Sequence, residues 1–209
     1  GPDGITNEML KLLPEQGQDM IHAYLQLMWA TGYTPQEWKQ SLTILLFKNK
    51  GTPLELKYYR RIGLENTIYK LWTRMITWAI ADYAERSNIL SYTQGGFRNK
   101  RTTTDQLELF TMLLEDAKVN KQDIYLLMVD FSEAFDTIDH DHLLQVMYDL
   151  GIPTDAIEVV KDLYTGASTI IQSPYGNTQP ISMDRGTIHG DSLPPPLFIL
   201  YLEPLLRWL

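Results

Sequence analysis

The side chains best placed for chemistry lie in residues 130–136, which read Asp-Phe-Ser-Glu-Ala-Phe-Asp. Asp130 directly follows the apolar run 124–129, which predicts a strand buried on both faces. A carboxylate at the end of such a strand must be solvated, paired or bound to a metal ion, because a bare buried charge is very costly. Oxygen ligands of this kind suit Mg²⁺, which also takes substrate phosphates. The alternative is that Asp130 caps the turn or helix that follows it.

Further aspartates follow this segment, and their spacing favours a helix start over a second metal site. Asp139 and Asp141 stand just before the amphipathic stretch 142–150, where the helix dipole favours carboxylates. His140 and His142 flank Asp141 and could suggest zinc. Because the chain has no cysteine and the two histidines lie two apart at a helix start, we interpret them as a solvated edge.

A second segment with chemical potential is 185–195, which reads Arg-Gly-Thr-Ile-His-Gly-Asp-Ser-Leu-Pro-Pro. Its glycines, Gly186 and Gly190, permit close approach of the backbone to a ligand. A helix is predicted to follow, and its N-terminus could face a phosphate. Simple loop geometry is the alternative interpretation of the same glycines.

Basic and aromatic side chains alternate in two parts of the first half of the chain. Such mixtures suit a nucleic acid, since cations contact phosphates and rings stack on bases. Scattered surface lysines are the alternative. The basic residues are Lys48, Lys50, Lys57, Arg60, Arg61, Arg98, Lys100 and Arg101, and the aromatic ones are Tyr58, Tyr59 and Phe97.

Charge is divided unequally along the 209 residues, whose formal net charge is −8. Residues 1–105 hold 13 basic and 10 acidic side chains, whereas residues 106–209 hold 5 basic and 16 acidic ones. The acidic half would repel a polyanion unless cations neutralise it. We therefore expect phosphate contacts in the first half and metal chemistry in the second.

Composition limits the class of protein. A hydrophobic content of 44% excludes wholesale disorder. No apolar run reaches the roughly 18 residues of a membrane span, and no signal peptide is visible at the start. The absence of cysteine excludes disulfides and thiolate zinc sites, and it fits a reducing, intracellular compartment, cytoplasm or nucleus.

Hydrophobic periodicity predicts the elements that must position these groups, and helices with a small sheet indicate an α+β fold. In the helix 103–119 we expect Leu107, Phe110, Met112, Leu113 and Leu114 to face inward. Residues 41–47 and 124–129 are predicted strands, and 168–183 a hairpin around Pro-Tyr-Gly-Asn. The predicted helices lie within 5–32 and over 65–86, 103–119, 142–150 and 153–166, with another from 197 onward after three prolines.

Taken in order, these segments resemble the reverse transcriptases of non-LTR (LINE-like) retrotransposons, and the resemblance covers nearly the whole chain. Residues 130–136 look like polymerase motif A and 185–198 like motif B. Several such motifs in the order and spacing of the family are highly specific. The other matching segments are 1–5 (Gly-Pro-Asp-Gly-Ile), 46–51 (Leu-Phe-Lys-Asn-Lys-Gly), 59–70 (Tyr-Arg-Arg-Ile-Gly-Leu-Glu-Asn-Thr-Ile-Tyr-Lys), 94–98 (Gln-Gly-Gly-Phe-Arg) and 102–106 (Thr-Thr-Thr-Asp-Gln).

The resemblance implies the fingers of a right-hand polymerase over residues 1–105 and part of its palm over 106–209, with helices on a small antiparallel sheet. It implies RNA-templated DNA synthesis from dNTPs on a DNA primer, with two Mg²⁺ ions and Mn²⁺ as a substitute. Asp130 would bind both ions, with the backbone carbonyl of Phe131 as a further ligand. The ring of Phe135 would occupy the space that a ribose 2′-hydroxyl needs.

The remaining roles are also implied by the resemblance. Lys48 and Arg60 would hold the incoming triphosphate, and His189 and Gly190 would lie against the nucleotide. Arg98, Lys100 and Arg101 would contact template or primer phosphates.

The chain departs from the pattern of the family at three places. Arg61 stands where a proline is usual, and His189 where a glutamine is usual. Pro194, Pro195 and Pro196 replace a Ser-Pro pair and its apolar neighbour, and could delay the start of the last helix.

The third polymerase motif, a hairpin with Asp-Asp, is absent, and the dipeptide occurs nowhere in the 209 residues. We therefore expect the chain not to polymerise alone, and the edge of an incomplete palm to self-associate. One alternative is a non-catalytic fragment that binds RNA or a protein partner through its basic residues. A second is an RNA-templated RNA polymerase, against which Phe135 and the order of the first motifs argue.

Overall fold

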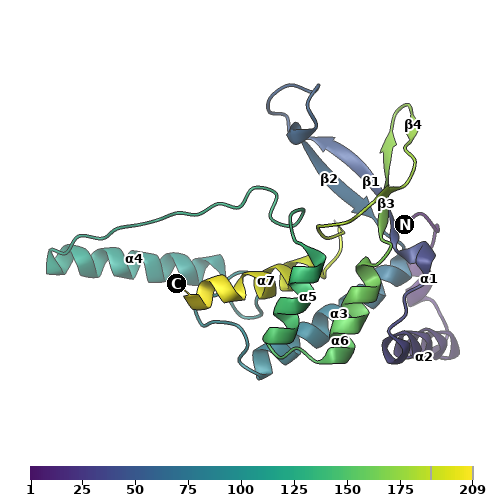
Figure 1. Cartoon of the computed structure of the whole chain (residues 1–209), viewed down its shortest axis with the longest axis horizontal. Helices are drawn as coiled ribbons and strands as arrows, with labels where there is room; N and C mark the ends of the chain where they lie inside the picture. The colour runs from purple at the N-terminus through teal and green to yellow at the C-terminus, as the bar shows by residue number, and fades with distance from the viewer. Residues whose placement is uncertain (189, 209) are drawn as a thin grey trace.

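The computed structural model describes residues 1–188 and 190–208, and it places a narrow, twisted sheet above a layer of helices (Figure 1). The α+β fold predicted from the sequence is confirmed. The helices are α1 (Asn7–Lys11), α2 (Glu15–Thr31), α3 (Thr67–Arg86), α4 (Thr103–Asn120), α5 (His140–Asp149), α6 (Thr154–Tyr164) and α7 (Pro194–Trp208), with 3₁₀ turns at Gln36–Trp38 and Leu56–Tyr58. The strands are β1 (Gln40–Phe47), β2 (Tyr59–Leu64), β3 (Ser168–Ser173), β4 (Gly176–Asn177) and β5 (Ile181–Ser182).

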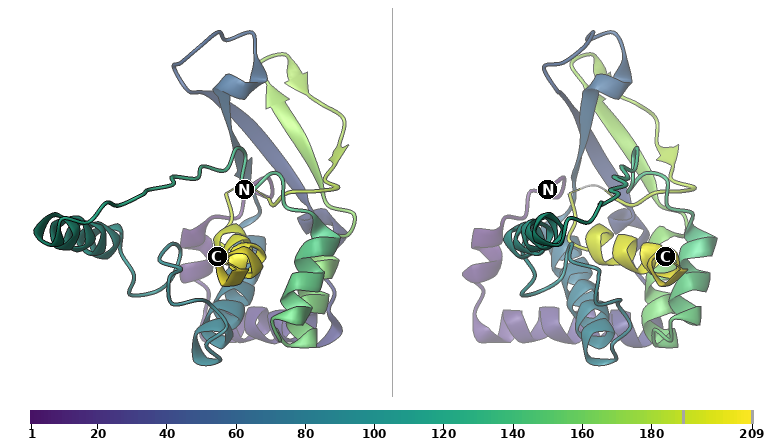
Figure 2. Two further views of the ribbon diagram at one scale, coloured as in Figure 1. Left: turned by 60° about the vertical axis from the view of Figure 1, so that its left-hand side comes forward. Right: turned by 90° about the vertical axis from the view of Figure 1, so that its left-hand side faces the viewer.

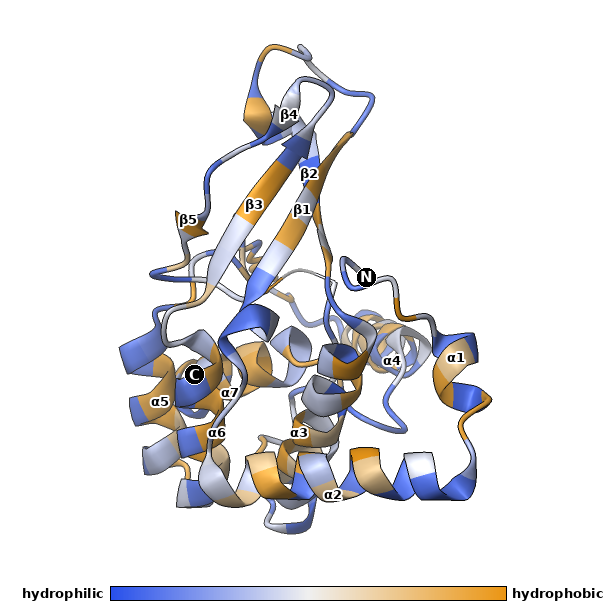
Figure 3. Cartoon of the chain, turned by 90° about the vertical axis from the view of Figure 1, so that its right-hand side faces the viewer, coloured by the Kyte–Doolittle hydropathy of each residue, from blue (hydrophilic) through white to orange (hydrophobic). Residues whose placement is uncertain are grey.

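The sheet is mixed, so the expectation of an antiparallel sheet was wrong in part. Strands β1 and β2 are antiparallel, with Leu42 opposite Leu64, because a short connection joins them. Strands β1 and β3 are parallel, with Gln40 opposite Ser168, and they stand side by side in Figure 3. Helices α3 to α6 lie between these two strands in the sequence. Because the connection is long, it does not force the strands to be antiparallel, as a tight hairpin would.

The core lies in the helical layer, where α3 packs against α6 and α7 and passes behind α5 and α6 in the view of Figure 1. Trp72 of α3 is fully buried, and its indole nitrogen donates a hydrogen bond to Thr34 Oγ1 at 3.2 Å. Leu143 of α5, Val160 of α6 and Leu197 of α7 belong to the same buried cluster. Replacing a buried aromatic of this size by alanine costs about 3–5 kcal/mol, so α3 stabilises the whole layer.

Helix α7 begins at Pro194, contrary to the expectation that three prolines delay its start. The N–H groups of the first helical turn have no hydrogen-bond acceptor within the helix, so proline loses no bond there. The fixed φ of proline also matches the helical value. Pro194 and Pro196 are buried beside Leu197. Neither α7 nor any other helix in the described part of the chain is long and apolar enough to cross a membrane.

Helix α4 stands away from the rest of the molecule, and the segment after it forms no strand (Figure 1, Figure 2). The predicted inward face of α4 was wrong, since Leu107, Met112, Leu113 and Leu114 are exposed and Phe110 is half-buried. The predicted buried strand was also wrong, because residues 124–129 are extended and exposed. An apolar run can become a buried strand only beside a neighbour, and none of the described strands pairs with it.

Two acids from distant parts of the chain, Glu65 after β2 and Asp191 before α7, lie close enough to influence each other's charge. The carboxyl of Glu65 is 2% exposed, and its Oε1 has no hydrogen-bond partner among the described residues. Burial, followed by the charge of Asp191, raises the pKa of Glu65 to about 8 against the pull of Lys70. Burial likewise raises the pKa of Asp191, whose Oδ1 accepts a hydrogen bond from Thr73 Oγ1 at 2.5 Å. Glu65 is therefore protonated at neutral pH.

The exposed run 124–129 leads to a prediction about self-association. We expect the wild-type chain to associate in a concentration-dependent way, because six uncharged apolar residues offer an unpaired strand. Leu127 is 85% exposed, and Leu127→Lys should raise the midpoint concentration of association roughly tenfold. Light scattering over a dilution series measures this midpoint. Gln122→Lys adds the same charge outside the run and should change little, whereas a monodisperse wild-type monomer would contradict the prediction.

The raised pKa of Glu65 leads to a second prediction. Between pH 4.5 and about 8 the unfolded chain ionises this carboxyl while the folded chain keeps it protonated, so the free energy of unfolding falls over that range. Between pH 5.5 and 8.5, the fall in the free energy of unfolding should be smaller in Glu65→Gln than in the wild type by roughly 1–3 kcal/mol. Urea unfolding at pH 5.5, 7 and 8.5 measures this difference. The exposed Glu37→Gln is the matched control, and equal slopes in all three proteins would refute the assignment.

Candidate functional site

The segments predicted as motif A and motif B lie against each other through their backbones. The N–H of Gly186 donates to the carbonyl of Ile138 at 2.7 Å, and the N–H of Thr187 donates to the carbonyl of Phe135 at 2.9 Å. Gly186 has a φ of +81°, and a Cβ there would lie 2.7 Å from the backbone oxygen of Asp136. Only glycine fits so close an approach, which explains this residue of the Arg-Gly-Thr sequence.

The ring of Phe135 lies among phenylalanines from two other parts of the chain. Its centroid is 5.3 Å from that of Phe198 in α7 and 6.1 Å from that of Phe97, which precedes α4 in the chain. Phe131 also contacts Phe198, at 6.0 Å and nearly perpendicular. We call Phe97, Phe131, Phe135 and Phe198 the phenylalanine cluster. Edge-to-face and tilted contacts of this kind are favoured by the ring quadrupole.

Asp130 lies at the end of the extended segment that follows α4, and it is exposed. Phe131 is also exposed. The two proposed metal donors, the Asp130 carboxylate and the Phe131 carbonyl, therefore both lie in an exposed segment, and this segment has no helix or strand. Among the described residues, no group of three acidic or histidine side chains could hold a metal ion. Among the described residues Asp130 therefore belongs to no such group, and a Mg²⁺ ion bound there would take most of its ligands from water and substrate phosphate.

Asp139 and Asp141 occupy the helix start that their spacing predicted. The Oδ1 of Asp139 accepts a hydrogen bond from the N–H of His142 at 2.9 Å and caps α5. Asp141 lies in the first turn of the same helix. The ring of His140 stacks on Tyr164 with 4.7 Å between centroids, and its Nε2 lies 2.7 Å from the carbonyl oxygen of Gly186. Through these contacts His140 links helices α5 and α6 to Gly186 in the segment predicted as motif B.

Arg61, at a position where the resemblance led us to expect proline, joins β2 to the segment predicted as motif A. Its guanidinium forms an ion pair with the carboxylate of Asp136. The Arg61 side chain is partly exposed, and pairs of this kind contribute about 1 kcal/mol or less. The ion pair therefore connects the β1–β2 hairpin to the turn that carries Phe135.

Lys48 and Arg60 lie on one face of the β1–β2 hairpin. Leu46 pairs with Arg60, and the bond from the Lys48 N–H to the Tyr58 carbonyl, 2.8 Å long, continues the ladder. Positions two apart along a strand share a face, so the two cations point the same way. Lys48 Nζ donates to the carbonyl of Lys57 at 3.0 Å, and Arg60 is exposed. A pair of cations on an exposed hairpin face is a suitable partner for phosphate.

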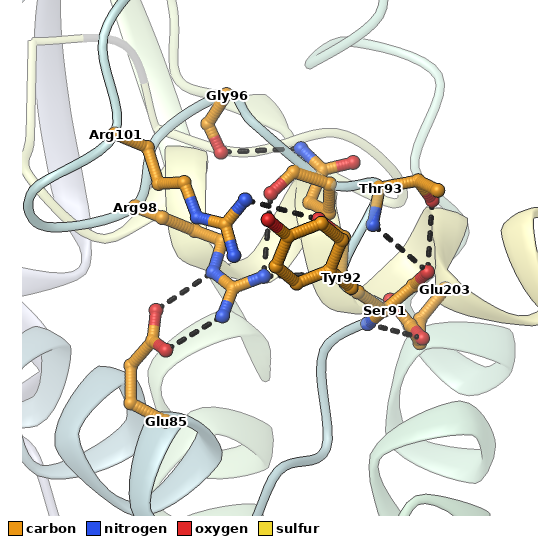
Figure 4. Close-up of polar contacts among 9 residues, drawn as sticks. Glu85, Ser91, Tyr92, Thr93, Gly96, Arg98, Arg101 and Glu203 are labelled. Atoms are coloured by element: carbon orange, nitrogen blue, oxygen red, sulfur yellow. Dashed lines mark hydrogen bonds and ion pairs between the residues drawn. The ribbon is translucent and has the colours of Figure 1, made fainter. Parts of the chain in front are cut away.

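Arg98 is engaged within the fold, as Figure 4 shows. Its guanidinium makes two bonds to the carboxylate of Glu85, at 2.8 and 2.7 Å. The same group donates to the carbonyls of Ser91 and Gln94. The Arg98 side chain is 10% exposed, and its hydrogen bonds hold the pKa of Glu85 below the ordinary value. The structure thus places Arg98 as an anchor of the loop before α4.

The other two predicted phosphate contacts differ from each other. The guanidinium of Arg101 lies over the ring of Tyr92 at 4.6 Å and donates to the Tyr92 carbonyl at 3.0 Å (Figure 4). Lys100 is exposed and has a φ of +61°. Of the three cations, Lys100 is the one whose charge faces solvent most openly.

Gly190 lies against the sheet. It has a φ of +91°, and a Cβ there would meet the backbone oxygen of Gly63 in β2 at 2.4 Å. The glycine is thus required by contact between two parts of the chain, whatever else it contacts. The predicted nucleotide residue His189 lies outside the described residues.

Sequence reasoning missed the partners of the predicted residues. From the sequence, Phe198 was placed in an apolar helix, Phe97 among residues that could stack on bases, and Glu85 was given no role. In the structure Phe97 and Phe198 contact Phe135, and Glu85 binds Arg98. The segment Gly-Gly-Phe-Arg was recognised as part of a matching motif, without a structural role. Contacts between segments so far apart leave no signal in local spacing.

Comparison with known proteins identifies the family. Residues 47–209 match the family described as reverse transcriptase (RNA-dependent DNA polymerase). A probable RNA-directed DNA polymerase from transposon BS of Drosophila melanogaster is 27% identical over 98% of the chain. The RNA-directed DNA polymerase from mobile element jockey of the same species is 27% identical over 69% of the chain. A retrovirus-related Pol polyprotein from the type-1 retrotransposable element R2 of Nasonia vitripennis is 22% identical over 99% of it.

The chain spans 22%, 16% and 19% of the lengths of these three relatives, so it corresponds to one part of each. The family match covers strand β2 and the clamped segments around Phe135 and Thr187, but only the last residue of β1. The chain therefore belongs to the reverse transcriptase family, as a domain of the non-LTR retrotransposon, LINE-like type.

Proposed function

We propose that this chain binds the RNA template, the DNA primer and the incoming dNTP for RNA-templated DNA synthesis. In that reaction the primer 3′-oxygen bonds to the α-phosphorus of the dNTP, and pyrophosphate leaves. The observation that carries the proposal is the backbone clamp between residues 135–138 and 186–187 in a chain of this family. The clamp holds an aromatic ring beside a loop whose backbone can approach a ligand closely, and both kinds of group occur in ligand-binding sites.

Within this proposal each site residue has a role. Phe135 is the gate whose ring excludes a ribose 2′-hydroxyl, since its backbone is fixed by Thr187 and its ring by its neighbours. Lys48 and Arg60 hold the triphosphate, which their common face of the hairpin supports. His189 and Gly190 contribute to the nucleotide side of the motif B loop.

Divalent ions, two Mg²⁺ or Mn²⁺, are part of the proposal through the family and not through this geometry. Asp130 and the Phe131 carbonyl are the two donors proposed here, and the described residues assemble no further set around them. The chain also has no Asp-Asp dipeptide. We therefore propose that these 209 residues bind substrates without joining them.

A second candidate is a non-catalytic nucleic-acid-binding role. Asp130 is exposed and belongs to no group of three acidic or histidine side chains among the described residues, which favours this role, as does the concentration of cations in the first half of the sequence. Both candidates include binding of RNA. They differ in whether a dNTP binds beside Phe135.

Primer extension on an RNA template tests catalysis directly. The purified chain with dNTPs and Mg²⁺ or Mn²⁺ should give no incorporation above that of Asp130→Ala, because one motif carboxylate cannot hold two ions. Asp123→Ala removes an exposed carboxylate from the same extended segment and serves as the control. Incorporation by the wild type and by Asp123→Ala that is lost in Asp130→Ala would overturn the proposed inactivity and support a catalytic role for Asp130.

The different surroundings of Lys100 and Arg98 allow a test of nucleic-acid contacts. Lys100→Ala should weaken binding of an RNA–DNA duplex and lower the slope of log K against log salt by about 1, with unchanged stability. Arg98→Ala should instead lower the free energy of unfolding by roughly 1–3 kcal/mol, because it leaves the Glu85 carboxylate without its partner. Fluorescence anisotropy at several salt concentrations and urea unfolding measure the two effects. The reverse pattern would contradict both assignments.

A further inference from the structure

We infer that Phe97 is a positioning residue for Phe135 and thereby a determinant of the choice between deoxyribonucleotides and ribonucleotides. The inference rests on the proposed function, because it concerns the gate of that nucleotide site. Its basis is a contact between two rings that lie 38 positions apart in the sequence, together with the unusual backbone that makes the contact.

The contact has the geometry of an edge-to-face pair. The centroids of Phe97 and Phe135 are 6.1 Å apart with 68° between the ring planes. Phe198 of α7 is a second neighbour of Phe135, at 5.3 Å and 55°. The gate ring therefore contacts one residue of the helical layer and one residue of the loop that leads into α4.

Core burial does not explain the presence of a phenylalanine at position 97. The Phe97 side chain is 60% exposed, so most of its apolar surface remains in water. Its φ is +58°, a left-handed conformation that is a costly exception for a bulky residue. Such conformations persist where the surrounding structure fixes them, and they are found at functional sites. In this left-handed conformation the Phe97 ring contacts the Phe135 ring, and we infer that this contact is its function.

The neighbouring residue fixes the conformation of Phe97. Arg98 binds the Glu85 carboxylate through two nitrogens and the carbonyl of Ser91 through the third, at 2.8 Å (Figure 4). The side chain of Gln94 donates to the carbonyl of Gly96 at 3.1 Å, which closes the turn before Phe97. The loop is thus anchored to α3 on one side and presents Phe97 on the other.

The consequence concerns the freedom of the gate ring. The Phe135 carbonyl accepts the Thr187 N–H, which fixes the backbone but leaves rotation about the Cα–Cβ bond. With Phe97 in place, rotation of the Phe135 ring is restricted on one side. Without Phe97, the ring gains room to turn, and a 2′-hydroxyl that it would have excluded can be accommodated. Phe97 therefore acts on sugar selection without contacting the nucleotide.

Fluorine NMR of the chain labelled with 4-fluorophenylalanine reports the contact without requiring catalysis. The sequence has six phenylalanines, and Phe135→Leu identifies the Phe135 resonance. Phe97→Asn removes the ring but keeps a residue that tolerates the left-handed conformation, and Phe97→Tyr retains the ring. Phe110→Leu is the control, since Phe110 lies in α4 and outside the phenylalanine cluster.

We expect Phe97→Asn to shift the Phe135 resonance and Phe97→Tyr and Phe110→Leu to leave it nearly in place. Titration with dATP and with ATP, followed through the labelled resonances, then gives the ratio of the two Kd values. Phe97→Asn should reduce the preference for dATP roughly three- to tenfold, the size of one aromatic contact, with dATP affinity changed less than about twofold. Phe97→Tyr should restore the preference. An unchanged Phe135 resonance or an unchanged ratio in Phe97→Asn would overturn the inference.

Phe135→Ala separates failure of this inference from failure of the proposed function. If Phe135→Ala lowers the preference for dATP and Phe97→Asn does not, Phe135 is the gate and Phe97 does not position it. If Phe135→Ala leaves the preference unchanged, or neither nucleotide moves any resonance of the wild type, the proposed nucleotide site itself is wrong. Unfolding of Phe97→Asn in urea, expected to match the wild type, confirms that the loop remains folded.

Discussion

The site depends on one close backbone contact, the approach of Gly186 to Asp136. Two hydrogen bonds, from Gly186 to Ile138 and from Thr187 to Phe135, hold the motif A turn against the motif B loop. A side chain at position 186 would collide with the backbone of Asp136 and separate the two segments. Phe135 keeps its place because of this contact, and the ion pair from Arg61 then joins the sheet hairpin to the same turn.

The molecule combines this rigid junction with an open segment that begins at α4. The junction is fixed by backbone hydrogen bonds, two glycines with positive φ and a cluster of rings. The segment 121–132 has neither helix nor strand, and the apolar side chains of residues 124–129 are exposed. Asp130 belongs to the open segment and Phe135 to the rigid one, although five positions separate them. The proposed nucleotide gate and the proposed metal donor thus lie on parts of the chain with very different constraints.

Local pattern predicted most helices because periodicity and caps are properties of short segments. The starts of α4 and α5, at Thr102 and Asp139, follow from side chains that bond to nearby N–H groups. Strand β2 was missed because Arg60 and Arg61 interrupt its alternation, and the direction of β3 because no short connection sets it. The run 124–129 has the composition of a buried strand, but burial depends on a neighbour, which composition does not specify. Arg98 was predicted to contact phosphate from its charge, whereas its bond to Glu85 could not be predicted because a sequence does not show which side chains meet in space.

The parallel pairing of β1 with β3 has a consequence for the order of folding. Gln40 and Ser168 are 128 residues apart, so this pairing closes a very long loop, whereas β1 and β2 meet across a short connection. Closing long loops is slow because the entropy of the intervening chain is lost before any contact compensates for it. On the ribosome, the β1–β2 hairpin can form early, but its other edge must wait until β3 has emerged. During synthesis that edge of β1 is open to pairing with any other strand, and a chaperone that shields it would raise the yield of folded protein.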